Sequence, residues 1–131
     1  MRFLFKPGST QFVDDPQISA PYPMWLSQIA VRATQRNTCL QLVGHTSKTG
    51  PPQVNERLSV LRAQFIKDLL QSSSPRLSDK LKAIGVGSRE TLIGTGRDDA
   101  SDAIDRRVDF NVSDHLRSDA VEPHPLRSTP L

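Results

Sequence analysis

The residues best suited to bind a ligand lie in a short polar loop and in the helix expected after it. The loop is GHTSKTG, residues 44–50, and it supplies hydroxyls, an amine and two glycines. Arg62 falls between the apolar positions of that helix, near its start, so its guanidinium should emerge close to the loop. Hydroxyls beside a fixed cation suit a small polar ligand.

Patterns typical of enzymes are missing from the sequence. Thr49 stands where a phosphate-binding G-x-x-x-x-G-K-[ST] loop needs its second glycine. The three histidines have no metal-ligand spacing, and no serine or cysteine has a base at a recognisable distance along the chain. We therefore expect a protein that is not an enzyme, with no metal and no cofactor.

Two regular elements should position the loop. Apolar residues at 39–43 predict a short buried strand before it. A helix should follow from about Asn55 to Gln71, because Pro51 and Pro52 cannot lie in a helix interior. The helix has an apolar stripe at spacings of three and four, made of Leu58, Leu61, Phe65 and Leu69.

The remaining elements follow from the same rules of periodicity. We expect strands at about 3–5, 81–86 and 108–112, helices at 24–34 and 98–104, and irregular connections at 9–23 and 91–96. This order predicts an α/β sandwich, in which a small mixed four-stranded sheet carries helices on one face. Residues 1–112 should form the domain. Residues 113–131 contain three prolines without periodicity, which predicts a flexible tail.

Composition excludes several classes of protein. The 131 residues suit one domain, and the net charge of +3 is too small and too scattered to indicate nucleic-acid binding. A single cysteine, Cys39, excludes an internal disulfide. No apolar run approaches the roughly 20 residues that span a bilayer, so this segment should not insert directly into a membrane.

Two blocks of sequence resemble signatures of a known family. GHTSKTG followed by NERLSVLRAQ resembles the peptidoglycan-binding motif of OmpA-like C-terminal domains (those of OmpA, MotB and Pal), usually G-H-T-D-x-x-G and then N-x-x-L-S-x-x-R-A. The block LKAIGVGSRETLIGTGRDDASDAIDRRVDFNV, at 81–112, resembles the second motif, G-x-G-x-x-x-P and then N-R-R-V-E. The resemblance covers roughly residues 1–112. One departure matters, because Ser47 stands where the family usually has aspartate.

The resemblance implies a ligand and a set of residues that bind it. In the family the loop aspartate takes the ammonium of diaminopimelate in the peptidoglycan stem, and the helix arginine takes its carboxylate. By motif position, Arg62 matches that arginine. The other ligand-binding residues implied for this chain are Thr46, Ser47, Thr49, Asn55, Asp105 and Arg107.

Each of these roles has a structural alternative. If Arg62 does not bind a ligand, it is expected to be a solvated arginine on the helix surface. The alternative role of Asn55 is to cap the start of that helix. Asp105 is otherwise an ion-pair partner of a neighbouring arginine or a cap that ends the short helix. Arg107 is otherwise paired with Asp109 or Asp102. His45 is expected to brace the loop.

Replacing the aspartate by Ser47 removes a charge from the predicted site. A hydroxyl accepts one hydrogen bond from an ammonium without charge, which should cost on the order of 1–3 kcal/mol of binding free energy. Three outcomes are open: weak binding, a different stem such as an amidated or lysine-type one, or substitution by another acid, for which Asp105 is the first candidate.

The resemblance implies non-covalent binding of peptidoglycan that anchors an envelope protein to the cell wall. Such a domain is expected in the periplasm, within a protein attached to the outer or inner membrane of a Gram-negative bacterium. The alternative is a domain that keeps the fold, has lost wall binding and assembles with other envelope-complex subunits, as in a secretion system. Ser47 keeps that alternative open.

Overall fold

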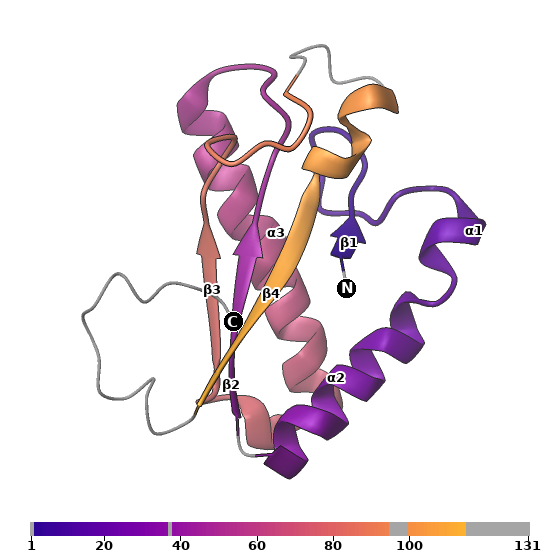
Figure 1. The fold of residues 1–131 in the computed structure, drawn as a ribbon, viewed down its shortest axis with the longest axis vertical. Helices are drawn as coiled ribbons and strands as arrows, with labels where there is room; N and C mark the ends of the chain where they lie inside the picture. Colours follow the sequence, from indigo (N-terminus) through magenta and orange to yellow (C-terminus); the bar gives the residue numbers. More distant parts are fainter. Residues whose placement is uncertain (1, 37, 95–99, 115–131) are drawn as a thin grey trace.

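The computed structural model describes residues 2–36, 38–94 and 100–114 (Figure 1). Short 3-10 helices are labelled η. In chain order the elements are β1 (Arg2–Leu4), α1 (Pro16–Ser19), α2 (Tyr22–Arg36), β2 (Thr38–Gly44), α3 (Pro52–Ser73), η1 (Pro75–Leu77), β3 (Leu81–Gly85), η2 (Ala100–Asp105) and β4 (Arg107–Asp114).

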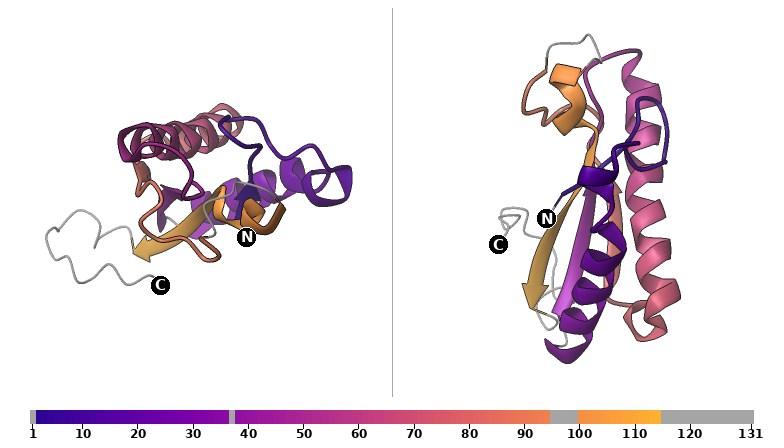
Figure 2. Two further views of the ribbon diagram at one scale, coloured as in Figure 1. Left: turned by 90° about the horizontal axis from the view of Figure 1, so that it is seen from above. Right: turned by 90° about the vertical axis from the view of Figure 1, so that its right-hand side faces the viewer.

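The strands form one mixed sheet in the order β1-β4-β2-β3. β2 and β3 are parallel, with Leu42 opposite Ala83, and β4 runs antiparallel to both of its neighbours, β1 and β2. Helix α3 lies along one face of this sheet, as the right-hand view of Figure 2 shows. The predicted fold class, a small mixed four-stranded sheet with packed helices, is confirmed.

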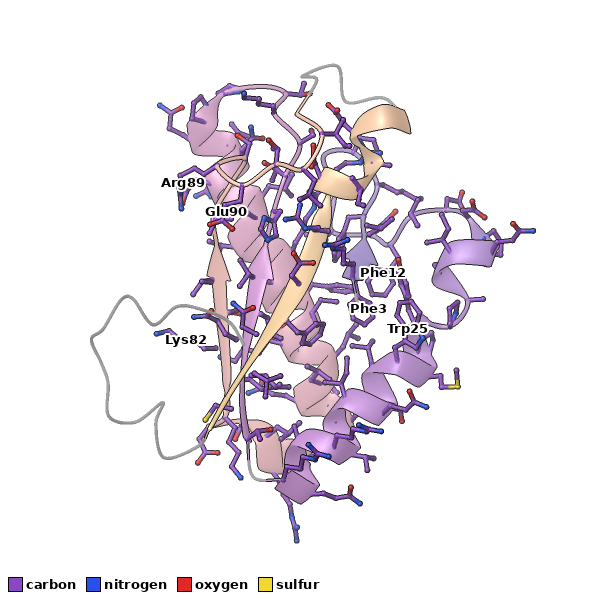
Figure 3. All side chains as sticks on the ribbon, viewed as in Figure 1. Phe3, Phe12, Trp25, Lys82, Arg89 and Glu90 are labelled. Carbon is purple, nitrogen blue, oxygen red and sulfur yellow. The ribbon has the colours of Figure 1, made fainter. Side chains whose placement is uncertain are left out.

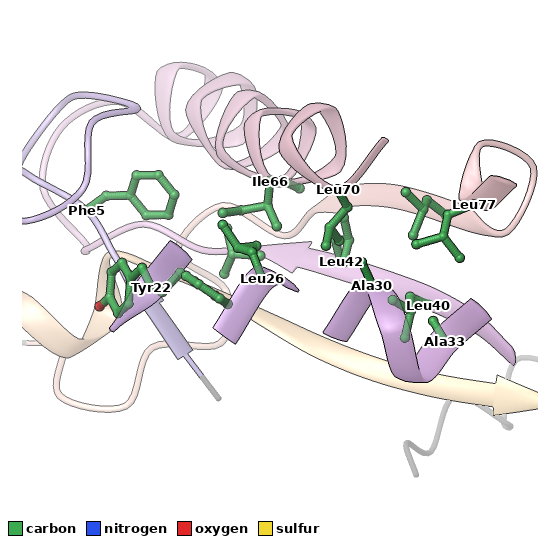
Figure 4. Packing of buried hydrophobic residues seen from close by; sticks show 14 residues of the cluster. Phe5, Tyr22, Leu26, Ala30, Ala33, Leu40, Leu42, Ile66, Leu70 and Leu77 are labelled. Carbon is green, nitrogen blue, oxygen red and sulfur yellow. The ribbon is translucent and has the colours of Figure 1, made fainter. Parts of the chain in front are cut away.

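The hydrophobic core lies between the sheet and the helices α2 and α3 (Figure 4). Leu42, Ile66 and Leu70 are fully buried at its centre. At the β1 end the core is aromatic: the ring of Phe3 lies 4.8 Å from that of Tyr22, centroid to centroid. Each such side chain stabilises the fold by roughly 1.5–3 kcal/mol when it leaves water.

The buried face of α3 differs from the predicted stripe. Leu61 is 49% exposed, so its place in that stripe is wrong. The helix instead buries a face that is polar at its N-terminal half and apolar further on, made of Asn55, Ser59, Arg62, Ala63, Ile66 and Leu70. The helix also begins earlier than predicted, at Pro52, because proline is well tolerated in the first helical turn.

Two glycines explain why a polar helix face lies against the sheet. A Cβ on Gly44 would lie 1.9 Å from the carbonyl oxygen of Ser59, and one on Gly85 would lie 2.3 Å from its Oγ. The Ser59 hydroxyl donates to the Glu56 carbonyl (2.8 Å) and accepts from the Gly87 N–H (2.9 Å). The helix is therefore seated directly on the carboxyl ends of β2 and β3.

Other boundaries shift by a few residues. The connection expected to be irregular contains the short helix α1, which Asp15 caps through the Gln17 N–H. The predicted short helix is a 3-10 helix over Ala100–Asp105, and residues 98–99 lie outside the described part. β4 continues to Asp114, two residues beyond the predicted domain boundary, and 115–131 of the predicted tail lie outside the described residues. Among the described helices none has the length and hydropathy of a membrane span.

Candidate ligand-binding site

The GHTSKTG loop leaves the carboxyl end of β2 at the point where β4 begins and β3 ends. The His45 N–H donates to the carbonyl of Arg107 (2.8 Å), and the Thr46 N–H donates to that of Gly87 (2.9 Å). Thr46 and Ser47 are consequently buried, at 2% and 5% exposure. This end of the sheet thus brings together both sequence blocks on which the predicted site depends.

Asn55 closes the loop from within the helix. Its amide Nδ2 donates to the carbonyl of Thr49 at 3.0 Å. The alternative role as helix cap is wrong, because the N-cap position is Pro51 and Asn55 lies inside α3. Thr49 itself is exposed. Whether either residue binds a ligand stays a prediction.

The guanidinium of Arg62 lies beside the loop, as expected, but it is fully buried and does not emerge from the surface. This burial also excludes a solvated helix arginine. The guanidinium donates to the carbonyls of Ser9 (2.8 Å), His45 (3.0 Å) and Lys6 (2.9 Å). It also lies over the ring of Phe5, 5.4 Å from its centroid. The arginine therefore ties the turn after β1 to the polar loop.

Asp105 is fully buried beneath the loop that follows β3. Its carboxylate accepts from the backbone N–H groups of Leu92, Ile93 and Gly94, the last at 2.8 Å. It also forms an ion pair with Arg107, with 3.9 Å between Oδ1 and Nη1. Sequence reasoning missed this ring of amides. The signal available was Gly94, which has a φ of +68° and lets three successive N–H groups converge.

Arg107 makes the ion pair that the sequence analysis offered as its alternative role. Its Nε donates to Asp109 Oδ2 at 2.8 Å, and its Nη2 donates to the Glu90 carbonyl at 3.3 Å. The residue is 4% exposed. Its Nη1, however, has no hydrogen-bond partner among the described residues.

His45 belongs to the same cluster. Its Nε2 lies 3.5 Å from Asp109 Oδ2. Burial, followed by the charge of Arg107, lowers the pKa of His45 from 6.5 to about 4. The imidazole is consequently neutral at neutral pH, and a proton on Nε2 would face Asp109 and leave Nδ1 as an acceptor. The prediction that His45 braces the loop agrees with this position.

At this end of the sheet, some buried polar side-chain atoms of the described residues make no hydrogen bond. In the described part of the chain, three buried side-chain atoms have no hydrogen-bond partner: His45 Nδ1, Thr46 Oγ1 and Arg107 Nη1. Buried polar groups are nearly always paired, so these atoms indicate capacity for a ligand or for water. The described residues contain no cluster that could hold a metal ion.

The fold is a small α/β sandwich domain with a polar end built from the loops after β2 and β3. The sequence matches the model of the OmpA family over residues 4–105. This is most of the chain, and the protein therefore belongs to the OmpA family. No curated protein sequence matches it.

Solved structures share the fold. The peptidoglycan-associated lipoprotein of Burkholderia pseudomallei superposes with a TM-score of 0.69 at 22% identity, over 86% of this chain and 89% of that one. The C-terminal domain of Helicobacter pylori MotB gives 0.65 at 17% identity, over 86% and 84%. The cell wall anchor of the T6SS from Pseudomonas aeruginosa gives 0.61 at 23% identity, over 84% and 73%. At these identities the likeness concerns the fold.

Proposed function

We propose that this OmpA-family domain binds the stem peptide of peptidoglycan non-covalently and anchors an envelope protein to the cell wall. The support is family membership, together with structural relatives whose names include a peptidoglycan-associated lipoprotein and a cell wall anchor. A periplasmic location, within a protein held at the outer or inner membrane, belongs to the same proposal. One relative is itself a periplasmic domain, from Helicobacter pylori MotB. Modest affinity suffices for an anchor that acts in several copies.

One observation carries the proposed chemistry: Arg107 is a buried cation whose Nη1 makes no hydrogen bond to the described residues and lies 3.9 Å from the carboxylate of Asp105. A buried guanidinium N–H that makes no hydrogen bond is available to donate to a ligand carboxylate, and such charge-assisted hydrogen bonds are about twice as strong as neutral ones. We assign the stem carboxylate to this nitrogen, with the Thr46 hydroxyl and His45 Nδ1 as neutral partners of the adjoining peptide.

Arg62 takes a different role in this proposal from the one its motif implies. Its guanidinium already serves three backbone carbonyls, two of which belong to the turn after β1. It would reach a ligand only if the carbonyls of Lys6 and Ser9 moved away. Arg62 therefore acts first as the brace of the site, and as a ligand residue only when that turn opens.

The protein groups that would bind the ammonium of the ligand form the weaker half of the site. Ser47 brings no charge, and the carboxylate of Asp105 is occupied by the three amides of the 92–94 loop. Thr49 and Asn55 frame the loop and offer only neutral groups. We therefore expect Ser47→Asp to tighten binding of a diaminopimelate-containing stem by roughly one to two decades.

The test is an NMR titration of the labelled domain with a diaminopimelate-containing muropeptide. Shifts at 45–49, Asn55 and 105–107 are expected for the wild type, with tighter binding for Ser47→Asp and a loss of at least about tenfold for Arg107→Gln. Arg57→Gln, on the exposed face of α3, serves as the matched control. Unchanged affinity of a well-folded Arg107→Gln variant would overturn the assignment.

A second function has specific support. Ser47 lacks the family's charge, and the guanidinium of Arg62 is turned inward. Both observations favour a domain that has lost wall binding and assembles with other envelope subunits. A flat titration at millimolar muropeptide, with both Ser47→Asp and the wild type well folded, would favour this second function over anchoring.

A further inference from the structure

The carboxylates beside Arg107 are already engaged within the protein. Asp105 is fully buried and accepts from three successive backbone amides of the 92–94 loop. Asp109 pairs with Arg2 at 3.3 Å and with Arg107 at 2.8 Å. An ammonium group that entered here would compete with these amides and guanidinium groups for the same oxygens, and it would face the positive charge of both arginines.

The surrounding loops do not supply the missing negative charge. Ser47 is neutral, and Lys48 beside it is an exposed cation. Asp102 is fully buried and has interactions of its own. Glu90 lies next to Arg89 on the loop after β3 (Figure 3), and its side chain is exposed. Because an exposed ion pair is worth only about 0–1 kcal/mol, Glu90 would be a poor substitute for a carboxylate within the site.

The same site does contain groups that suit a carboxylate and a neutral N–H. Arg107 Nη1 makes no hydrogen bond to the described residues, and neither do Thr46 Oγ1 and His45 Nδ1. A hydroxyl oxygen or a neutral imidazole nitrogen accepts a single N–H well. Neutral acceptors leave the charge of a buried ammonium unpaired, which is costly. The described residues are therefore complementary to a ligand that has a carboxylate and an uncharged N–H.

We propose that the domain selects stems whose diaminopimelate amine is acylated, as it is in a cross-link between two stems. This selectivity rests on the proposed function, since it concerns the same site. Acylation converts the ammonium into an amide, which has no charge and donates one N–H, and it leaves the carboxylate on the same carbon unchanged. Arg107 would bind that carboxylate, and the Thr46 hydroxyl or His45 Nδ1 would accept from the amide.

Other stems fit these groups less well. An amidated diaminopimelate or a lysine-type stem keeps its ammonium and lacks the side-chain carboxylate, so its charges are the opposite of those that the site complements. A diaminopimelate stem with a free amine keeps both charges, and the ammonium then has no accessible carboxylate within the described part of the site. Specificity is a difference between affinities, and this cost falls on the free amine alone.

The experiment is a calorimetric titration of the full chain with two probes. One is a diaminopimelate tripeptide stem with a free side-chain amine, and the other is the same stem with that amine acylated by N-acetyl-D-alanine. The acylated stem should bind at least about tenfold more tightly. Equal affinities, or tighter binding of the free amine, would overturn the selectivity and leave anchoring in place. Binding of neither probe at millimolar concentration would overturn the proposed function and the selectivity with it.

Three variants locate the cause of the preference. Ser47→Asp adds a carboxylate that can pair with the ammonium, so its preference should shift toward the free amine. Arg107→Gln should weaken both probes by at least about tenfold, because both carry the carboxylate. Glu90→Gln, the matched control, removes an exposed acid at the same end of the sheet and should leave the preference unchanged. A preference that Ser47→Asp leaves intact, or that Glu90→Gln enlarges, would also overturn the proposal.

Discussion

At the scale of single residues, the buried arginine of α3 is the clearest departure from what its motif implies. Arg62 has no exposed surface and serves the carbonyls of Ser9, His45 and Lys6. Losing such a partner leaves each buried acceptor with a desolvation cost of about 1–3 kcal/mol. Its first contribution is therefore to stability.

We expect Arg62→Ala to lower the free energy of unfolding by on the order of 3 kcal/mol or more, because a fully buried side chain is removed and three backbone carbonyls lose their donor. Urea denaturation monitored by circular dichroism measures the change. Arg57→Ala, on the exposed face of the same helix, should cost less than about 0.5 kcal/mol. Similar midpoints for the two variants would contradict the bracing role.

His45 should make the domain sensitive to mild acid. The pKa of His45 is lowered to about 4 in the folded state, so the unfolded chain, with a pKa of about 6.5, takes up the proton first as the pH falls. The stability that depends on a neutral His45 is fully present above about pH 6.5. It is lost progressively toward pH 4, where the free energy of unfolding falls by up to about 1.4 kcal/mol per pH unit.

The measurement is urea unfolding of the wild type and of His45→Asn across this pH range. Carboxylates elsewhere titrate in both proteins, so the difference between the two isolates the imidazole. The free energy of unfolding should fall more steeply for the wild type. Parallel curves would show that burial of His45 does not perturb its protonation.

At the scale of elements, the contact between α3 and the ends of β2 and β3 organises the site. Ser59 meets Gly44 and Gly85 so closely that a Cβ at either position would overlap it. This contact sets the height of the helix above the sheet. It thereby positions Arg62, one turn further along α3, under the loop.

Gly44→Ala should destabilise the domain by more than Gly50→Ala. The added methyl at Gly44 would lie 1.9 Å from a helix carbonyl, which the backbone cannot avoid without moving α3. Gly50 has open space around its Cβ position and only the strain of its φ of +86°, on the order of 1–2 kcal/mol. Thermal unfolding of both variants decides the order, and an equal loss would mean that the helix shifts freely.

At the scale of the whole molecule, the end of β4 sets the boundary of the domain. Ser113 and Asp114 pair with Cys39 and Thr38, so the sheet includes two residues that the sequence analysis assigned to the tail. The prediction that a flexible tail follows now concerns residues 115–131.

Truncation after Asp114 should leave the unfolding midpoint unchanged, because every described pair of the β2–β4 ladder is retained. Truncation after Val112 removes two of those pairs and should lower the midpoint. Calorimetry of the two truncated chains and the full chain makes the comparison. A large loss on removing 115–131 alone would contradict the tail prediction.

The sequence by itself determined the family, the order of the elements and the position of the polar loop. These follow from local patterns: alternation in β4, helical periodicity in α2, and two ordered motifs. The ion pair of Arg107 with Asp109, predicted from the sequence as an alternative to ligand binding, is confirmed. Such features depend on residues that are close together along the chain, so local sequence patterns can predict them.

Only the tertiary structure decided which atoms at the site remain unpaired. The apolar stripe placed Leu61 inside and Arg62 outside, but the two glycines draw a polar helix face onto the sheet and reverse that order. The amides that hold Asp105 come from a loop that precedes it by more than ten residues. Hydrogen bonds between such distant segments depend on how the elements are assembled, and spacing along the sequence cannot specify them.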